Sequence, residues 1–178
     1  RVGRRRLVLF LVAANAGKRL PRHGGEPAAH ELHGAPVGVE RLDGDIVRQS
    51  LTRDLGFTKE DRDKNIERVT FVAKLLTRNG VAVLCSFISP YIARREKSRA
   101  EISNFVECYV ECDLDTLIER DVKGLYKKAL AGEIKNFTGV SDPYEAPPNA
   151  EITVNSASQT IAESMANILQ RLEELGAD

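Results

Sequence analysis

Four residues near the start of the chain have the types and spacing of a phosphate-binding loop. Asn15–Lys18 (N-A-G-K) directly follow the apolar run Leu7–Val12, which has the length and branched side chains of a buried strand. They match the second half of the loop G-x-x-x-x-G-K-[ST], whose backbone N–H groups and lysine hold phosphate oxygens. Val12 stands at the first glycine position, and Arg19 replaces the hydroxyl residue. A Gly-Lys pair after a strand is also an ordinary turn, so this signal alone leaves both interpretations open.

Polar groups suited to phosphoryl chemistry also follow the other expected strands. Asp43 and Asp45 come after an expected strand at 37–42, and Ser89 comes after one at 81–87. The segment after the expected strand 105–112 is basic and contains Arg120, Lys123, Lys127 and Lys128. Carboxylates that position a metal or a hydroxyl, with cations that offset charge, are what phosphoryl transfer requires. Each group also has a simpler interpretation, as a turn with capping aspartates or as a solvated helix end. Their convergence on one edge of a sheet favours a functional site.

The elements that must position these groups alternate between strands and helices. The expected strands are 7–12, 37–42, 81–87, 105–112 and 151–154, and the expected helices are 45–54, 58–80, 90–102, 113–120 and 160–175. Helix starts are indicated by the capping residues Thr58, Asp113 and Thr160. This alternation predicts an α/β fold with a parallel sheet, helices on both faces, and ligands at the carboxyl ends of the strands. Between Lys18 and Pro36 only residues 28–33 have a helical pattern. The three histidines between Lys18 and Pro36 (His23, His30 and His33) are expected to be exposed.

Composition indicates a single folded domain. The 178 residues are 42% hydrophobic and 29% charged, with 26 basic and 26 acidic side chains. The zero net charge gives no support for a nucleic-acid or membrane partner. No stretch is long enough to span a membrane, and cleavage at the signal-like segment 4–16 would remove the first strand, so a cytoplasmic protein is expected. Cys85, Cys108 and Cys112 lack metal-site spacing and are interpreted as reduced core thiols.

Several longer motifs resemble the adenylylsulfate kinases over roughly residues 41–175. In chain order they are L-D-G-D-I-V-R (42–48), L-G-F-T-K-E-D-R-D-K-N-I-E-R (55–68), F-I-S-P-Y (87–91), R-D-V-K-G-L-Y-K-K-A (120–129), G-E-I-K-N-F-T-G (132–139) and D-P-Y-E-A-P (142–147). The resemblance implies one domain over residues 1–178 with a three-layer P-loop kinase fold. It also implies a mostly parallel five-stranded sheet and a mobile lid at about 121–145.

The resemblance implies a kinase of sulfate assimilation. ATP would phosphorylate the ribose 3′-hydroxyl of adenosine 5′-phosphosulfate (APS) with Mg²⁺ as cofactor, giving 3′-phosphoadenosine 5′-phosphosulfate (PAPS). A homodimer is expected, and an ATP sulfurylase is expected as a fused or associated partner. No nucleic-acid or membrane partner is expected.

The resemblance also assigns roles to individual residues. ATP would be bound by Asn15, Ala16, Gly17, Lys18 and Arg19. The substrate would be bound by Asp43, Asp45, Arg48, Phe57, Arg62, Asn65, Ile88, Ser89, Lys123, Asn136 and Phe137. Phe57 and Phe137 would enclose the adenine, and Arg48 and Arg62 would hold the phosphosulfate. The catalytic residues would be Lys18, Asp45 and Ser89. Asp45 would be the general base or would hold Mg²⁺ through water. Ser89 would form a phosphoserine intermediate or only bind the substrate.

The phosphate loop departs from the family pattern. The family has G-L-S-G-A-G-K-[ST]-T where this chain has V-A-A-N-A-G-K-R-L at 12–20, and arginine at position 19 cannot ligate Mg²⁺ as a hydroxyl does. Three interpretations remain open. The first is an active kinase whose loop tolerates the changes, or whose coding sequence has a shifted frame before about Val37. The second is a domain that binds APS or PAPS without kinase activity and regulates an ATP sulfurylase. The third, a kinase for another nucleotide, is disfavoured by the substrate motifs.

Overall fold

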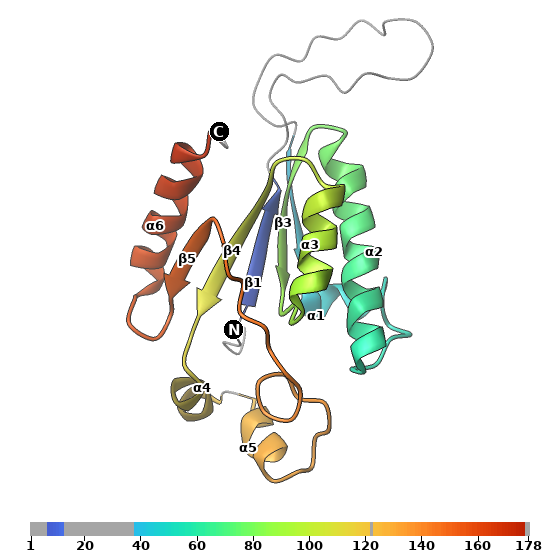
Figure 1. Ribbon diagram of the computed structural model, residues 1–178, viewed down its shortest axis with the longest axis vertical. Coiled ribbons are helices and arrows are strands. Elements are labelled where there is room, and N and C mark those ends of the chain that lie inside the picture. Colours follow the sequence, from blue (N-terminus) through green and yellow to red (C-terminus); the bar gives the residue numbers. More distant parts are fainter. Residues whose placement is uncertain (1–6, 13–37, 122, 177–178) are drawn as a thin grey trace, which may run out of the picture.

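The computed structural model describes the backbone of residues 7–12 and, with side chains, residues 38–121 and 123–176. These residues form a sheet with helices packed against it (Figure 1). The strands are β1 (Leu7–Val12), β2 (Gly38–Asp43), β3 (Val81–Phe87), β4 (Phe105–Glu111) and β5 (Ile152–Asn155). The helices are α1 (Gly44–Val47), α2 (Lys59–Thr77), α3 (Ile92–Glu101), α4 (Leu114–Arg120), α5 (Leu125–Leu130) and α6 (Ile161–Glu174).

The sheet has the strand order β2-β3-β1-β4-β5 and is mostly parallel, as predicted. β2 pairs in parallel with β3, and β4 pairs in parallel with β5. β1 is antiparallel to both β3 and β4, and its arrow in Figure 1 points opposite to theirs. The prediction that β1 runs parallel to the other strands is therefore wrong. Its sequence is apolar throughout, and both ladder types satisfy the backbone, so the residue pattern did not encode a direction.

The direction of β1 decides at which edge of the sheet this strand ends. Val12, its last residue, is paired with Val83 and Phe105, near the starts of β3 and β4. The carboxyl end of β1 thus lies at the opposite edge from the carboxyl ends of the other four strands. The predicted ATP-binding residues 15–19 lie outside the described residues.

Strand register shows that helices cover both faces of the sheet. Cys85 and Glu107 are both opposite Phe10 in the backbone register, so they share a face. Cys85 belongs to the core formed with α2, while Glu107 meets α3 through an ion pair. Cys108 points to the other face, where it packs with β5 and Ile168 of α6. Helices on both faces make the three layers that the sequence predicted.

Local capping signals fix several helix starts as expected. The Thr58 hydroxyl accepts a hydrogen bond from Asp61 N at 3.1 Å, and Asp113 accepts one from Thr116 N at 2.8 Å. Thr160 and Glu163 form a reciprocal capping box at the start of α6. The expected helix 45–54 is shorter than predicted, because α1 covers only Gly44–Val47 and turns follow it.

Two further expectations concern the core and the membrane. The three cysteines are buried, as predicted, and burial raises the pKa of the Cys85 and Cys108 thiols to about 12. Within the described part of the chain, no helix is both long enough and apolar enough to cross a membrane.

Candidate active site

The carboxyl ends of β2 to β5 border one large cavity of about 1180 Å³. This is the edge where parallel strands were predicted to present a ligand site. The cavity brings together all of the predicted substrate residues except Ser89. Those that line it are Asp43, Asp45, Arg48, Phe57, Arg62, Asn65, Ile88, Lys123, Asn136 and Phe137.

Asp43 at the end of β2 and Asp45 at the start of α1 make different contacts. The Asp43 carboxylate caps α1 by accepting hydrogen bonds from Asp45 N at 2.9 Å and Ile46 N at 3.4 Å. The Asp45 carboxylate faces the cavity and lies 3.2 Å from the ammonium nitrogen of Lys123. Its side chain is 65% exposed, so a ligand can reach it. Of the two carboxylates, that of Asp45 is therefore the more open to a ligand.

Two arginines flank the exposed ring of Phe57. The guanidinium carbon of Arg48 lies 4.4 Å from the ring centroid, and that of Arg62 lies 5.7 Å away. Arg48 Nη1 also donates to Leu55 O and Gly56 O, each at 3.2 Å, which fixes the turn before the ring. Phe57 is 53% exposed. An open aromatic face next to two forked cations suits a planar base that carries an oxyanion.

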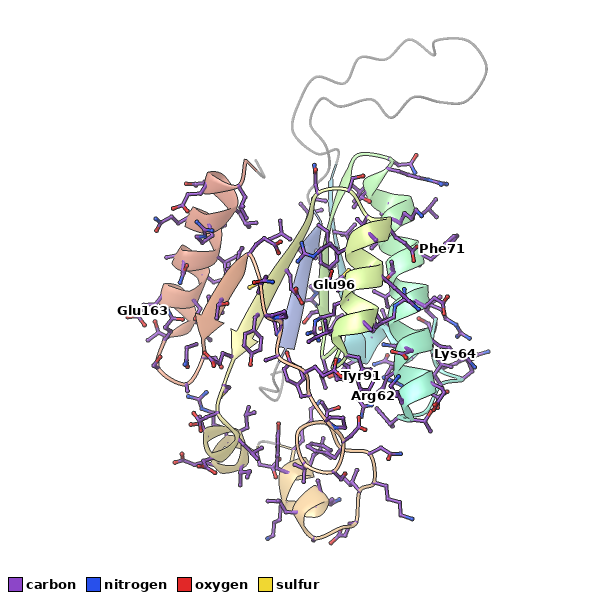
Figure 2. The ribbon with its side chains drawn as sticks, in the orientation of Figure 1. Arg62, Lys64, Phe71, Tyr91, Glu96 and Glu163 are labelled. Atoms are coloured by element: carbon purple, nitrogen blue, oxygen red, sulfur yellow. The ribbon has the colours of Figure 1, made fainter. Side chains whose placement is uncertain are left out.

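Arg62 connects α2 to the segment that follows α5. It donates from Nε to Phe57 O at 3.1 Å and from Nη2 to Asn136 O at 2.6 Å. Its Nε also lies 3.6 Å from the carboxylate of Asp142, which accepts the Tyr91 hydroxyl at 2.9 Å. Figure 2 shows Arg62, in the first turn of α2, close to Tyr91, which caps the start of α3. Burial, together with the hydrogen bond to Asp142, raises the pKa of Tyr91 to about 12.

The second predicted aromatic residue comes from the segment after α5. Phe137 is buried and packs edge-to-face against Tyr126 of α5, with ring centroids 4.9 Å apart. Asn136 precedes it with a φ of 55°. Phe57 and Phe137 therefore line one cavity from segments that are far apart in the sequence.

Ser89 does not line the cavity, although its neighbours Ile88 and Pro90 do. It is 2% exposed and has a φ of 38°, in the left-handed region that favours glycine. Within the described part of the chain, no hydrogen-bond partner reaches Ser89 Oγ or Asn65 Oδ1. The structure thus brings Asn65 into the cavity wall and places the Ser89 side chain behind it.

A second part of the cavity wall, near α4, β5 and α6, holds none of the predicted substrate residues, and of its polar groups the sequence pointed only to Arg120. Arg120 donates from Nη1 to Ser156 O at 2.8 Å and so links α4 to the turn after β5. The other lining residues here are Val110, Leu114, Leu117, Val154, Gln159, Ile161, Ser164, Met165 and Ile168. Ser156 follows β5, and applying the strand-end rule to this strand would have found it.

The acidic groups present set limits on how a metal could be held. Among the described residues, no three His, Cys, Asp or Glu side chains gather into a metal-binding group. Mg²⁺ is usually held by one or two carboxylates, with water and phosphate oxygens completing its shell. The exposed Asp45 carboxylate at the cavity fits that arrangement.

The sequence profile of the adenylylsulphate kinase family matches residues 8–155 of this chain. The chain belongs to this family. A probable adenylyl-sulfate kinase of Pseudomonas aeruginosa is 65% identical over 80% of this chain and 66% of its own length. A probable bifunctional SAT/APS kinase 2 of Sorangium cellulosum is 56% identical over 82% of this chain and 25% of its own length. The chain therefore spans just under two thirds of the first relative and a quarter of the second.

A solved structure of this family has the same fold. The APS kinase of Mycobacterium tuberculosis in complex with AMPPNP and APS matches with a TM-score of 0.72 at 37% identity. The match covers 77% of this chain and 81% of that chain. It confirms the α/β architecture of the family that the motifs predicted.

Proposed function

We propose that this chain transfers the γ-phosphoryl group of ATP to the ribose 3′-hydroxyl of APS. One observation carries the proposal: the cavity collects ten of the eleven predicted substrate residues from segments spread between Asp43 and Phe137. An arrangement of this kind requires the whole fold, so it is more specific than any one motif. The aromatic rings and arginines that line the cavity match the adenine and the phosphosulfate of APS.

The aromatic and basic groups would bind the substrate. Phe57 and Phe137 would hold the adenine between them, since aromatic faces stack on bases with little directional demand. Arg48 and Arg62, both adjacent to the Phe57 ring, would donate to the phosphosulfate oxygens. Asn65, with its buried side-chain oxygen, would accept a hydrogen bond from the nucleoside.

Asp45 would act on the reacting hydroxyl. Its carboxylate would accept the proton of the 3′-hydroxyl as that oxygen attacks the γ-phosphorus atom. Lys123, 3.2 Å from Asp45, would offset negative charge on the transferred group. Because Ser89 is buried behind the cavity wall, direct transfer without a phosphoserine intermediate is the simpler mechanism.

ATP would occupy the part of the cavity near α4 and β5. Arg120, Ser156, Gln159 and Ser164 are polar groups in a mostly apolar wall, which suits a second nucleotide. Asp45 would hold Mg²⁺ through water, and the ion would supply charge stabilisation at the phosphoryl group. The predicted lid, at about 121–145, would close over the two nucleotides and exclude water.

A second candidate function is a binding domain that holds APS or PAPS without phosphoryl transfer. The direction of β1 favours it, because this strand ends at the edge opposite to the cavity. Arg19, in the position of the family's Mg²⁺-binding hydroxyl, favours it as well. Such a domain would regulate an ATP sulfurylase.

One pair of assays separates the two candidates. The purified chain is mixed with ATP, Mg²⁺ and APS while ADP is followed, and APS binding is measured by calorimetry. APS-dependent ADP release supports the kinase. Retained APS binding without ADP release contradicts the kinase and supports the binding domain. Absence of both binding and release overturns both candidates. If only release is missing, Arg19→Ser tests whether the hydroxyl is the missing part.

We also propose that the chain works in the cytoplasm as a homodimer, next to an ATP sulfurylase. The family resemblance supports these partners, and a relative named as bifunctional SAT/APS kinase supports the last of them. Phe71 of α2 is 67% exposed and points outward in Figure 2, so it offers apolar surface on that side. Sedimentation equilibrium of wild type and Phe71→Glu tests the dimer.

A further inference from the structure

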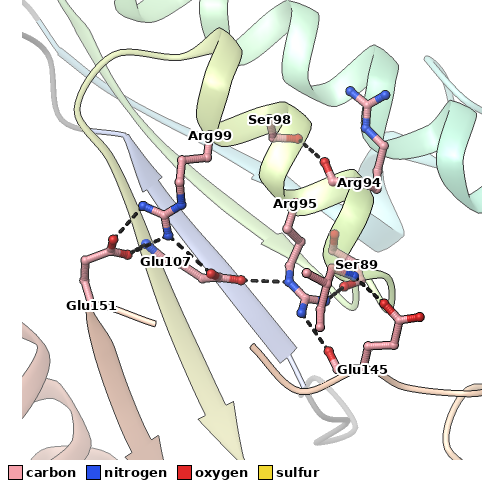
Figure 3. A network of polar contacts seen from close by, with 9 residues as sticks. Ser89, Arg94, Arg95, Ser98, Arg99, Glu107, Glu145 and Glu151 are labelled. Carbon is pink, nitrogen blue, oxygen red and sulfur yellow. Dashed lines mark hydrogen bonds and ion pairs between the residues drawn. The ribbon is translucent and has the colours of Figure 1, made fainter. Parts of the chain in front are cut away.

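A buried arginine of α3 contacts two separate segments at the edge of the cavity. Arg95 is 2% exposed. It donates from Nη1 to Ser89 O and from Nη2 to Glu145 O, both at 2.7 Å. Its Nε forms an ion pair with Glu107 Oε1 of β4 at 2.8 Å (Figure 3). The three contacts spread over the whole guanidinium fork and fix its orientation.

The first contact holds a strained residue. Ser89 has a φ of 38°, a conformation that non-glycine residues keep only when their surroundings enforce it. The hydrogen bond from Arg95 to the Ser89 carbonyl is one such constraint. Ile88 and Pro90, on either side of Ser89, line the cavity. The conformation at Ser89 therefore sets where these two residues stand in the cavity wall.

The second contact holds the carboxyl-terminal end of the predicted lid. Glu145 N donates to Pro90 O at 2.9 Å, and Glu145 Oε2 accepts from Ile92 N at 2.6 Å. Together with the hydrogen bond from Arg95 to Glu145 O, these contacts join this segment to the loop after β3. Asp142, three residues earlier, carries the contacts to Tyr91 and Arg62.

We propose that Arg95 is a positioning residue for APS, which holds the loop 88–90 and the carboxyl-terminal end of the lid in one fixed geometry. The inference rests on the proposed APS site, and it adds a residue that does not line the cavity. Glu107 compensates the buried charge of Arg95 and orients its fork. Lysine cannot replace this arginine, because a single ammonium group cannot reach the two carbonyls and the carboxylate in the same plane.

Arg99 offers a matched control within the same network. It lies on the same helix, meets Glu107 Oε2 at 3.3 Å, and forms a two-pronged pair with Glu151 at 2.5 and 2.9 Å. Its described contacts are to Glu107, Glu151 and the Phe105 ring, and none is to the loop 88–90 or to Glu145. Loss of the arginine fork at position 99 should therefore disturb the network without moving the cavity wall.

The test measures APS binding to the full chain by calorimetry, well below each variant's unfolding temperature. Arg95→Lys is expected to raise the APS dissociation constant about tenfold, and Arg99→Lys less than twofold, although both lower the unfolding temperature. Equal dissociation constants for Arg95→Lys and wild type overturn the proposal. Failure of wild type to bind APS would instead overturn the proposed function, so the two failures are distinguishable.

Two further variants test whether Arg95 acts through Ser89 and through its pairing with Glu107. In a Ser89→Gly background, where a φ of 38° is no longer strained, the penalty of Arg95→Lys should fall to about threefold. An unchanged penalty contradicts the role through Ser89.

If Arg95→Lys does not fold, Glu107→Gln carries the test, because it keeps the side-chain volume and removes the charge that orients Arg95. A rise of at least threefold in the APS dissociation constant is expected, and no rise overturns the proposal.

Discussion

Removal of the Asp142 carboxylate should open the end of the predicted lid. Asp142 accepts the Tyr91 hydroxyl at 2.9 Å and lies 3.6 Å from Arg62 Nε, with side-chain exposures of 18% for Asp142 and 9% for Arg62. At an effective dielectric constant near 20, a pair at this distance attracts by about 5 kcal/mol, much of which desolvation offsets. We therefore expect the free energy that keeps this segment closed to fall by about 2 kcal/mol through loss of the ion pair. Loss of the hydrogen bond should lower it by about 1 kcal/mol more.

Hydrogen exchange reads this change directly. The amides of Val140, Ser141 and Asp142 all donate to Phe137 O at 3.0 Å, so they report whether the segment 137–142 is closed. A loss of about 3 kcal/mol corresponds to about a hundredfold faster exchange at these amides, if they exchange by local opening. Amides in the middle of α2 should keep their wild-type rates.

A matched control is Asp63→Ala. Asp63 pairs with Lys59 at 3.5 Å, nearly the distance of the Arg62–Asp142 pair, but with larger side-chain exposures, 37% for Asp63 and 63% for Lys59. Its loss should leave exchange at 140–142 unchanged, since surface pairs of this kind contribute little. Wild-type exchange at 140–142 in Asp142→Ala would refute the claim that Asp142 closes this segment. Equal acceleration in both variants would show that the effect is general destabilisation.

Three more outcomes are expected. Phe57→Ala should raise the APS dissociation constant about tenfold, measured by calorimetry, because stacking on a base contributes about 1–3 kcal/mol; an unchanged value would remove Phe57 from the adenine site. Asp45→Asn should lower kcat about a hundredfold or more in the ADP assay while APS still binds; a wild-type kcat would exclude Asp45 as the base. Tyr91→Phe should destabilise the protein, as measured by urea unfolding. The pKa of the Tyr91 hydroxyl is raised to about 12 in the folded protein, whereas it is near 10 in the unfolded chain. The hydroxyl therefore contributes fully to the free energy of unfolding below about pH 10, and this contribution is lost as the pH rises from about 10 to 12. The difference between the two proteins should therefore shrink over that range, and a difference that grows would contradict the raised pKa.

Local signals in the sequence predicted much of the fold. The side chains of Thr58, Asp113 and Thr160 cap the three helices they were expected to start, because an N-cap depends on residues within one turn. The strand Val81–Phe87 was placed at its observed bounds. The short helix Leu125–Leu130 was not predicted, because its segment stands out in the sequence only by its basic charge.

Features that depend on distant partners were not predictable in the same way. The direction of β1 is set by which strands pair with it, and an apolar run fits either direction. Glu107 lies in an apolar strand, and nothing local shows that it is buried against Arg95 of the preceding helix. The burial of Ser89 depends likewise on contacts made far along the chain. The family motifs, by contrast, predict eleven substrate residues, and ten of these line one cavity, because the motifs preserve such long-range information.

Identification of the reaction product tests directly whether this chain transfers the γ-phosphoryl group of ATP to APS. The chain is incubated with APS, Mg²⁺ and ATP labelled with ¹⁸O at the γ-phosphoryl group, and the nucleotides are separated and analysed by mass spectrometry. We predict that the labelled phosphoryl group appears on the ribose 3′-oxygen of APS, with one ADP formed for each PAPS. Recovery of unlabelled APS, with the label retained in ATP or released as phosphate, would contradict it.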